Sequence, residues 1–339
     1  MAVTRLSDVI EPVAFTEYVA QNTAEKSELV TSGVMTRNAR IEQQLTAGAD
    51  SFSVPAWLDL GNEEANIVND DPDVESTPNK LAAVAYRVRK AYLHQSWSAM
   101  NLASELAGSS ALQRIQDRAA AYWTRQLQTR LVASLRGVLA DNVANDAGDM
   151  VVDITGETGD AAIFSAGAVI DAAHTLGDGL RDVAAIAMHS DTYARALKND
   201  LIATIPDSQG GMIQTFRGLA IVVDDSMPKD NIAADPETDP AEWAYTSVLF
   251  KPGAVGYGIT APREALGTEV ESAPAKGNGG GQQILHSRNN LAIHPAGFSF
   301  IDGAGVGISP SIADLAAAAN WDRVDERKHV GLAFLRHKL

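Results

Sequence analysis

The length of 339 residues is more than one hydrophobic core usually serves, which favours two domains or one domain with long extensions. A formal charge of −16 argues against a surface that binds nucleic acid or anionic lipid throughout, and a hydrophobic share of 45% excludes a wholly disordered chain. The chain has no cysteine, which excludes disulfides and thiolate metal sites, and its apolar runs are too short for a membrane-spanning helix.

The first fifty residues are predicted to form an N-terminal arm (residues 1–50). Short apolar clusters are separated there by polar linkers and by Pro12, and they carry too little apolar surface for a core of their own. We therefore expect residues 1–40 to become ordered only by docking on other copies of the chain.

Two segments with alternating side chains predict an extended β-hairpin over residues 51–95. Residues 51–56 and 84–89 alternate apolar side chains with small or polar ones, as half-buried strands do. The connection contains Pro72 and Pro78, which break strands. An isolated hairpin is at best marginally stable in water, so we expect this one to lie across a second copy of the chain. The acidic residues assigned to that contact are Asp59, Glu63, Glu64, Asp70 and Asp71.

A long helix is predicted from about residue 110 to 141, a segment without proline and rich in alanine, leucine, glutamine and arginine. Apolar residues recur every four positions from Ile115 to Leu135 and predict its buried face. Four arginines fall on nearly one other face. This basic stripe consists of Arg114, Arg118, Arg125 and Arg136. It is either a solvated surface or a contact with an acidic neighbour or with packaged nucleic acid.

The charge is distributed unevenly along the chain. Residues 80–140 contain nine Lys and Arg residues but only two acidic ones, Glu105 and Asp117. In contrast, the acidic connection before them contains no Lys or Arg between residues 59 and 75. Complementary blocks of this kind favour self-association, and we count Arg87 and Arg89 among the basic contact candidates.

From about residue 150 the pattern changes to alternating helices and strands. Helices are predicted at 164–176 and from Ser190 to Leu201, and buried strands at 183–188, 219–223 and 247–250. Later strands are predicted at 254–255 and 284–293, with a short helix at 312–320.

No catalytic residue, cofactor site or metal site is predicted. His189 stands beside Ser190 and Asp191, but adjacent residues point apart and cannot form a proton relay. The spacing of His286 and His294 matches no metal-ligand motif. A hydrolase or metal enzyme that uses these three histidines remains an alternative, and it would require them to converge with a carboxylate in one cleft.

The order of these elements resembles the major capsid protein of tailed bacteriophages, whose fold is shared with encapsulins and the herpesvirus capsid floor. The resemblance covers essentially the whole chain and rests on several short phrases in a fixed order. These are Ala187-Met-His-Ser-Asp191, Phe216 to Pro228, Tyr245 to Gly258, Glu269-Val-Glu271 before Gly277 to Gly281, and Trp321-Asp-Arg-Val324.

The resemblance implies an α+β fold with an N-terminal arm, an extended hairpin loop, a peripheral domain with a long spine helix, and an axial α/β domain. The implied boundaries are 1–50 for the arm, 51–95 for the hairpin, 96–149 for the peripheral domain, 150–255 for the axial domain, and 256–339 for the return strands and the C-terminal part of the peripheral domain.

The implied function is that of a virion shell subunit without catalysis, which forms pentamers and hexamers around double-stranded DNA and contacts neither a membrane nor a specific DNA sequence. The implied partners are other copies of the chain, a portal, a scaffolding protein that we expect to be separate because the arm starts at once, and in some members a decoration protein. Assembly is expected in the host cytoplasm. An encapsulin-type cellular compartment is the alternative within the same fold.

Some family members join subunits by lysine–asparagine bonds, but here Lys80 is the only lysine near the hairpin connection.

Overall fold

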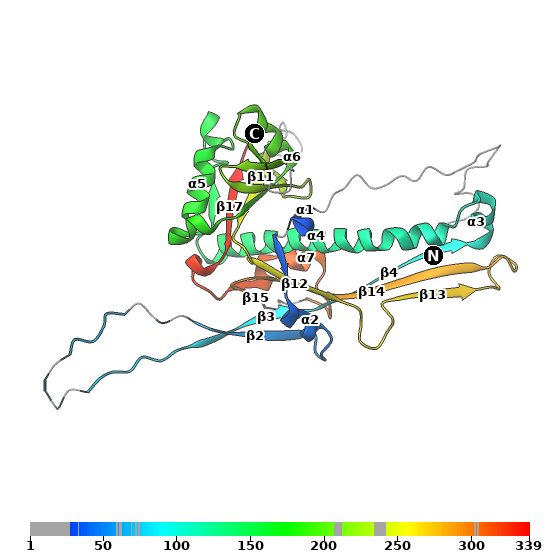
Figure 1. Ribbon diagram of the computed structural model, residues 1–339, viewed down its shortest axis with the longest axis horizontal. Helices are drawn as coiled ribbons and strands as arrows, with labels where there is room; N and C mark the ends of the chain where they lie inside the picture. Colours follow the sequence, from blue (N-terminus) through cyan, green and yellow to red (C-terminus); the bar gives the residue numbers. More distant parts are fainter. Residues whose placement is uncertain are drawn as a thin grey trace.

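The computed structural model describes residues 28–339 with internal gaps, and helices and strands alternate along it (Figure 1). The gaps are residues 33, 59, 61, 62, 69, 72, 74, 207–211, 234–241, 302 and 304. The α-helices are α1 (Glu28–Thr31), α2 (Ala39–Leu45), α3 (Asn101–Ala107), α4 (Ala111–Asn145), α5 (Ala166–His174), α6 (Ser190–Lys198) and α7 (Ile312–Ala316). The strands are β1 (Met35–Arg37), β2 (Ser51–Trp57), β3 (Ala83–Arg89), β4 (Ala91–Met100), β5 (Val151–Asp153), β6 (Ala185–Met188), β7 (Ala203–Pro206), β8 (Met212–Phe216), β9 (Leu219–Val223), β10 (Lys229–Asn231), β11 (Trp243–Phe250), β12 (Val255–Thr260), β13 (Thr268–Ala273), β14 (Gln282–Pro295), β15 (Phe298–Phe300), β16 (Trp321–Arg323) and β17 (Leu332–His337).

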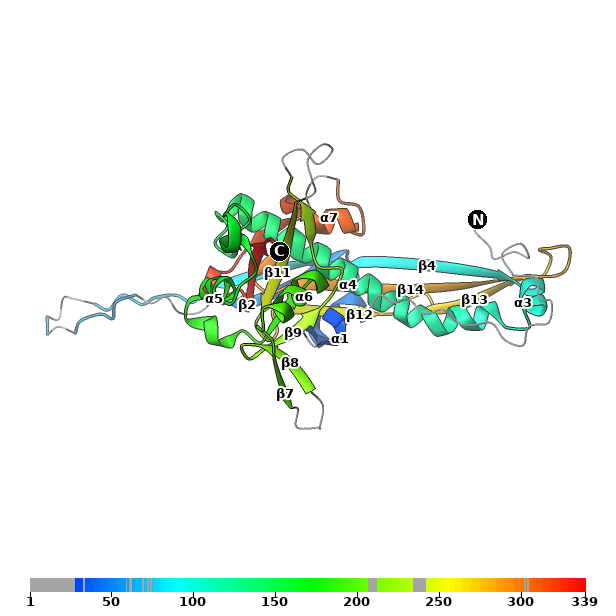
Figure 2. The same ribbon diagram turned by 90° about the horizontal axis from the view of Figure 1, so that it is seen from above.

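An elongated unit consists of α4 and a sheet that runs beside it (Figures 1 and 2). The long strand β14 pairs with β12 near the body and with β13 and β4 farther out. The predicted helix is confirmed as α4, whose 35 residues correspond to a length of about 50 Å. The hydroxyl of Ser110 caps it by accepting a hydrogen bond from the Gln113 N–H at 3.1 Å. Trp123, Leu127 and Leu131 are buried on its inner face, as the four-residue spacing predicts.

An α/β unit contains an eight-stranded sheet in the order β5-β17-β11-β6-β9-β8-β7, with β10 added to β11. Helices α5 and α6 lie in this unit (Figure 1). The predicted strands at 183–188, 219–223 and 247–250 correspond to β6, β9 and β11. The last strand departs from the expected boundaries, since β17 pairs with β11 and β5 in this sheet instead of returning to the peripheral domain. Its apolar residues 332–335 are buried on both faces there, as expected for a strand inside a sheet that is covered on both sides.

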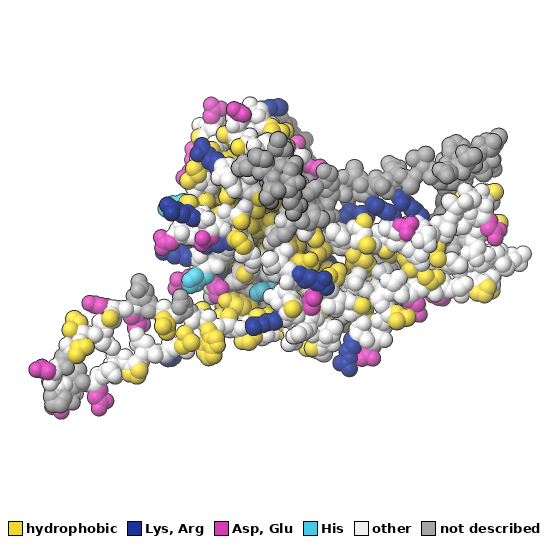
Figure 3. All heavy atoms as spheres, in the orientation of Figure 1, with side chains coloured by type: hydrophobic (Ala, Val, Ile, Leu, Met, Phe, Trp, Pro, Cys, Tyr) yellow, Lys and Arg dark blue, Asp and Glu magenta, His cyan; other side chains and the backbone are white. Residues whose placement is uncertain are grey.

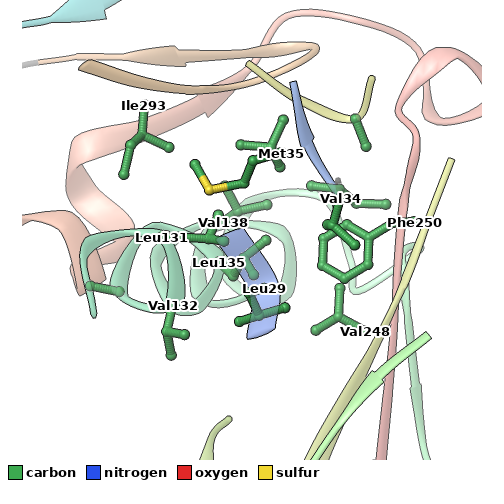
Figure 4. Packing of buried hydrophobic residues seen from close by; sticks show 14 of the residues in the cluster. Leu29, Val34, Met35, Leu131, Val132, Leu135, Val138, Val248, Phe250 and Ile293 are labelled. Carbon is green, nitrogen blue, oxygen red and sulfur yellow. The ribbon is translucent and has the colours of Figure 1, made fainter. Parts of the chain in front are cut away.

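The main core forms where α4 meets the α/β unit (Figure 4). Leu131 and Leu135 from α4 pack in the same cluster as Val248 and Phe250 from β11. Leu29 and Met35 also belong to this cluster, and β1 pairs in parallel with β12. The expectation that residues 1–40 dock only on other copies is therefore wrong for the described part of that segment, because these apolar side chains complete the core of their own chain. Residues 1–27 lie outside the described residues.

The predicted hairpin is confirmed as the antiparallel pair β2 and β3, which extends away from the body (Figure 1). The pairing runs from Ser51 opposite Arg89 to Trp57 opposite Ala83. Residues 91–95, which the predicted boundary includes in the hairpin, instead begin β4, because they pair with β14. We call residues 58–82 the tip.

Candidate assembly surfaces

The tip exposes both carboxylates and large apolar side chains. Glu63, Glu64, Asp70 and Asp71 are exposed, and Asp59 lies outside the described residues. The exposed fractions are 87% for Ile67 and 94% for Val68. Trp57, where the strands end, is exposed to 73%. This apolar surface was not predicted, although Ile67 and Val68 lie between the acidic residues in the sequence. Exposed apolar side chains gathered on a projecting segment favour a protein–protein contact.

Two of the tip carboxylates accept hydrogen bonds from within the tip. The side-chain amide of Asn79 donates to Glu63 at 2.8 Å, and the Asp73 N–H donates to Asp71 at 3.0 Å. The hairpin and the outer part of α4 extend from the body in different directions, so the tip and the basic stripe of one chain lie apart (Figures 1 and 2). A contact between them therefore requires two copies of the chain.

The basic stripe follows α4, along which Lys and Arg side chains gather in Figure 3. Arg136 forms an ion pair with Asp230 of β10 at 2.9 Å, a partner that local sequence patterns do not indicate. Arg118 and Arg125 are half-buried and have no ion-pair partner among the described residues. Arg114 is half-buried as well. Arg118 and Arg125 thus remain available for a carboxylate or phosphate partner, whereas Arg136 is already paired within the chain.

The two arginines of β3 make contacts within their own chain near the base of the hairpin. The Arg87 N–H donates to the hydroxyl of Ser299 at 3.1 Å. Arg89 forms an ion pair with Asp50 at 2.9 Å and donates to the carbonyl of Gly307 at 2.9 Å. Because its guanidinium is used in this way, Arg89 is better explained as an intrachain contact than as an inter-subunit one.

The three histidines of the enzyme alternative do not converge. His189 caps α6 by accepting a hydrogen bond from the Asp191 N–H at 3.1 Å. His286 lies 3.3 Å from His94 and 3.2 Å from Glu271, on the face of the sheet opposite α4. His294, eight residues along the same strand and so about 26 Å away, packs against Tyr86.

Within the described ranges no three His, Asp or Glu side chains are arranged to hold a metal ion, and no helix is long and apolar enough to cross a membrane.

We expect the subunit to lose stability in mild acid because of His337, which is fully buried, and His294, which is half-buried. Burial lowers the pKa of His294 and of His337 to about 4, and the Ser247 hydroxyl lies 3.1 Å from Nε2 of His337. The unfolded chain binds these protons near pH 6.5 and the folded chain only near pH 4. The free energy of unfolding therefore falls as the pH is lowered through this interval, by up to about 3 kcal/mol for each histidine. Urea unfolding of unassembled subunits at pH 7 and pH 4.5 measures this loss. The His337→Gln variant should show a smaller loss than the wild type, and an equal loss would contradict the assignment.

The comparisons with known proteins agree with this architecture. No protein-family model matches the chain. Its sequence is 34% identical over 342 residues to the major capsid protein of Bacillus phage SPP1, an alignment that covers 100% of this chain and 99% of that protein. The fold is similar to the capsid asymmetric unit of cyanophage Pam1, with a TM-score of 0.63, 11% identity, and coverage of 97% and 96% of the two chains. The capsid of Ralstonia phage GP4 is similar with a TM-score of 0.57, 11% identity, and coverage of 100% and 98%.

Proposed function

Because the chain belongs to the major capsid protein family of tailed bacteriophages, we propose that it is the structural subunit of an icosahedral virion shell, forming pentamers and hexamers around double-stranded DNA. The observation that carries this proposal is the 34% identity over the full chain. The role is structural and not enzymatic. The elongated shape and the projecting hairpin support it, since both offer large surfaces to other copies of the chain.

Electron microscopy of the purified protein tests the proposed function. We expect closed polyhedral shells, produced by the chain alone or together with its scaffolding protein. Soluble monomers without closed particles under both conditions would contradict the proposal. Shells that package a cellular enzyme instead of DNA would support the encapsulin-type alternative.

Within the shell, we infer that the hairpin of one subunit lies across a neighbouring subunit. The contact candidates on the hairpin are the tip carboxylates, and those on the neighbour are Arg114, Arg118 and Arg125 of the basic stripe. The separation of tip and stripe within one chain supports an inter-subunit pairing. The exposed Ile67 and Val68 add apolar surface to the same contact.

Neutralising the basic stripe should weaken subunit association without changing DNA retention. In the variant Arg114→Gln, Arg118→Gln and Arg125→Gln, the tip carboxylates lose their partners, and exposed ion pairs are worth about 0 to 1 kcal/mol each. Shell stability should then depend less on salt, because the screened pairs are absent. Light scattering of shells across salt concentrations measures this effect, and Arg136→Gln, which loses only an intrachain pair, is the matched control. Intact shells that retain less DNA would show instead that the stripe faces the DNA.

We also propose finer partners. These are a scaffolding protein and a portal during assembly in the host cytoplasm, with a decoration protein as an optional partner. The net charge of −16 supports loose, non-specific contact with packaged DNA, since a negative subunit repels phosphate.

A further inference from the structure

A fully buried lysine lies where the hairpin leaves the body. Lys90 is the single residue between β3 and β4, which belong to different sheets. Its side chain is 0% exposed, whereas lysine is almost never fully buried without a partner. Its Nζ atom donates to the carbonyl of Ala47 at 2.7 Å and lies 5.9 Å from the centre of the Phe52 ring. The ammonium group thus connects the start of β4 to the segment that leads into β2.

Residues 89–92 also donate hydrogen bonds to the backbone carbonyls of Ala49 and Asp50, in the segment that leads into β2. The Lys90 N–H donates to Asp50 at 2.9 Å, and the Tyr92 hydroxyl donates to Ala49 at 2.9 Å. Ala49 has a φ of 90°, in a region that costs a residue with a Cβ about 1 to 3 kcal/mol. We call residues 47–50 and 89–92 together the root clamp, because their mutual contacts join the two ends of the hairpin.

The root clamp adjoins a small buried cluster. Ile41 and Leu45 of α2 form a small buried cluster with Val88 of β3. Helix α2 lies directly on β12, since a Cβ at Gly258 would be only 2.8 Å from the side chain of Ile41. Farther along the hairpin, the Tyr86 hydroxyl donates to Asp325 at 2.8 Å. The hairpin is therefore attached to the body near its base through β3.

A buried ammonium group is a costly way to stabilise a fold. Burial lowers the pKa of Lys90 because it disfavours the charged form. Replacing a buried ion pair with apolar groups of similar size is often neutral or stabilising, and in some proteins the retained buried charge specifies one conformation. Lys90 lies where such a choice of conformation concerns the direction in which β2 and β3 leave the body.

We propose that the root clamp presets the direction of the hairpin, so that the unassembled subunit already holds it in the orientation required by its neighbour. This inference rests on the proposed shell function. If the hairpin could take many orientations, each inter-subunit contact would cost the conformational entropy of fixing one of them. A hairpin whose direction is already fixed in the free subunit does not add this cost to assembly. Lys90 acts here as a positioning residue and not as a contact residue.

Paired spin labels in the full-length, unassembled subunit test this proposal. The chain has no cysteine, so Ala83→Cys on β3 and Ala120→Cys on α4 provide the only two labelling sites. We expect a narrow distance distribution in the Lys90 protein and a broad one in Lys90→Met. The Lys80→Met variant, which removes an exposed lysine on the same hairpin, is the matched control and should stay narrow. Amide exchange at residue 90 should become about 10- to 100-fold faster in Lys90→Met, as expected for the loss of a hydrogen bond to a charged group.

Several outcomes would overturn the proposal. A broad distribution in the Lys90 protein would show that the hairpin is not preset, and an unchanged width in Lys90→Met would show that Lys90 does not set its direction. If Lys90→Met fails to fold, Tyr92→Phe removes only the hydroxyl on Ala49 and should also broaden the distribution. Shell formation by the unlabelled wild type is measured in a separate experiment. A negative result for the root clamp is therefore distinguishable from a negative result for the proposed shell function.

Discussion

Replacing Ile67 and Val68 with serine should abolish shell assembly while leaving the free energy of unfolding of the subunit unchanged. Both side chains are almost fully exposed in the single chain, so the fold does not depend on them. Burying an aliphatic side chain of this size is worth about 1.5 to 3 kcal/mol, so each inter-subunit contact would lose about 3 to 6 kcal/mol. Because every subunit repeats the contact, the loss is multiplied over the shell.

The comparison with the tip carboxylates separates apolar from electrostatic attraction. In the variant Glu63→Gln, Glu64→Gln, Asp70→Asn and Asp71→Asn, each exposed pair contributes only about 0 to 1 kcal/mol, so assembly should weaken rather than disappear. The Ile308→Ser variant, which changes an isoleucine exposed to 75% outside the hairpin, is the control for surface apolarity in general. Sedimentation and electron microscopy measure assembly, and urea unfolding measures subunit stability. Normal shells from the Ile67→Ser and Val68→Ser double variant would refute the apolar contact.

The variant Gly137→Ala should destabilise the subunit by about 3 kcal/mol, although alanine favours helices over glycine by about 1 kcal/mol. Gly137 lies inside α4 where the helix meets Trp321 and α7. A Cβ at this position would lie 2.1 Å from the Leu315 carbonyl oxygen and 2.4 Å from Nε1 of Trp321. These two atoms are joined by a hydrogen bond of 2.7 Å, so neither can move without breaking a buried contact.

Chemical denaturation measures this effect directly. The Gly156→Ala variant is the matched control, because a Cβ there would meet nothing within 4 Å, and its stability should change by less than about 0.5 kcal/mol. A Gly137→Ala protein as stable as the wild type would show that α7 and Trp321 can move away from α4 at little cost.

Local sequence patterns are sufficient to predict the elements that depend on neighbouring residues. Alternation predicts β2 and β3, and the four-residue apolar spacing predicts α4, because one face of each must be buried. The short phrases around β6 and β9 identify the family without any knowledge of packing. The acidic tip and the basic stripe are also visible in the sequence, since charge is a property of each residue.

The tertiary structure alone decides how segments far apart in the chain meet. The pairing of β17 with β11, the burial of Leu29 in the main core and the ion pair of Arg136 with Asp230 all join residues at least 80 positions apart. The sequence by itself therefore determined the family, the hairpin and the spine helix, whose signals are periodic and local. Only the three-dimensional packing decided that Lys90 is buried at the root of the hairpin and that no side chain fits at Gly137, because both depend on which distant atoms occupy the neighbouring space.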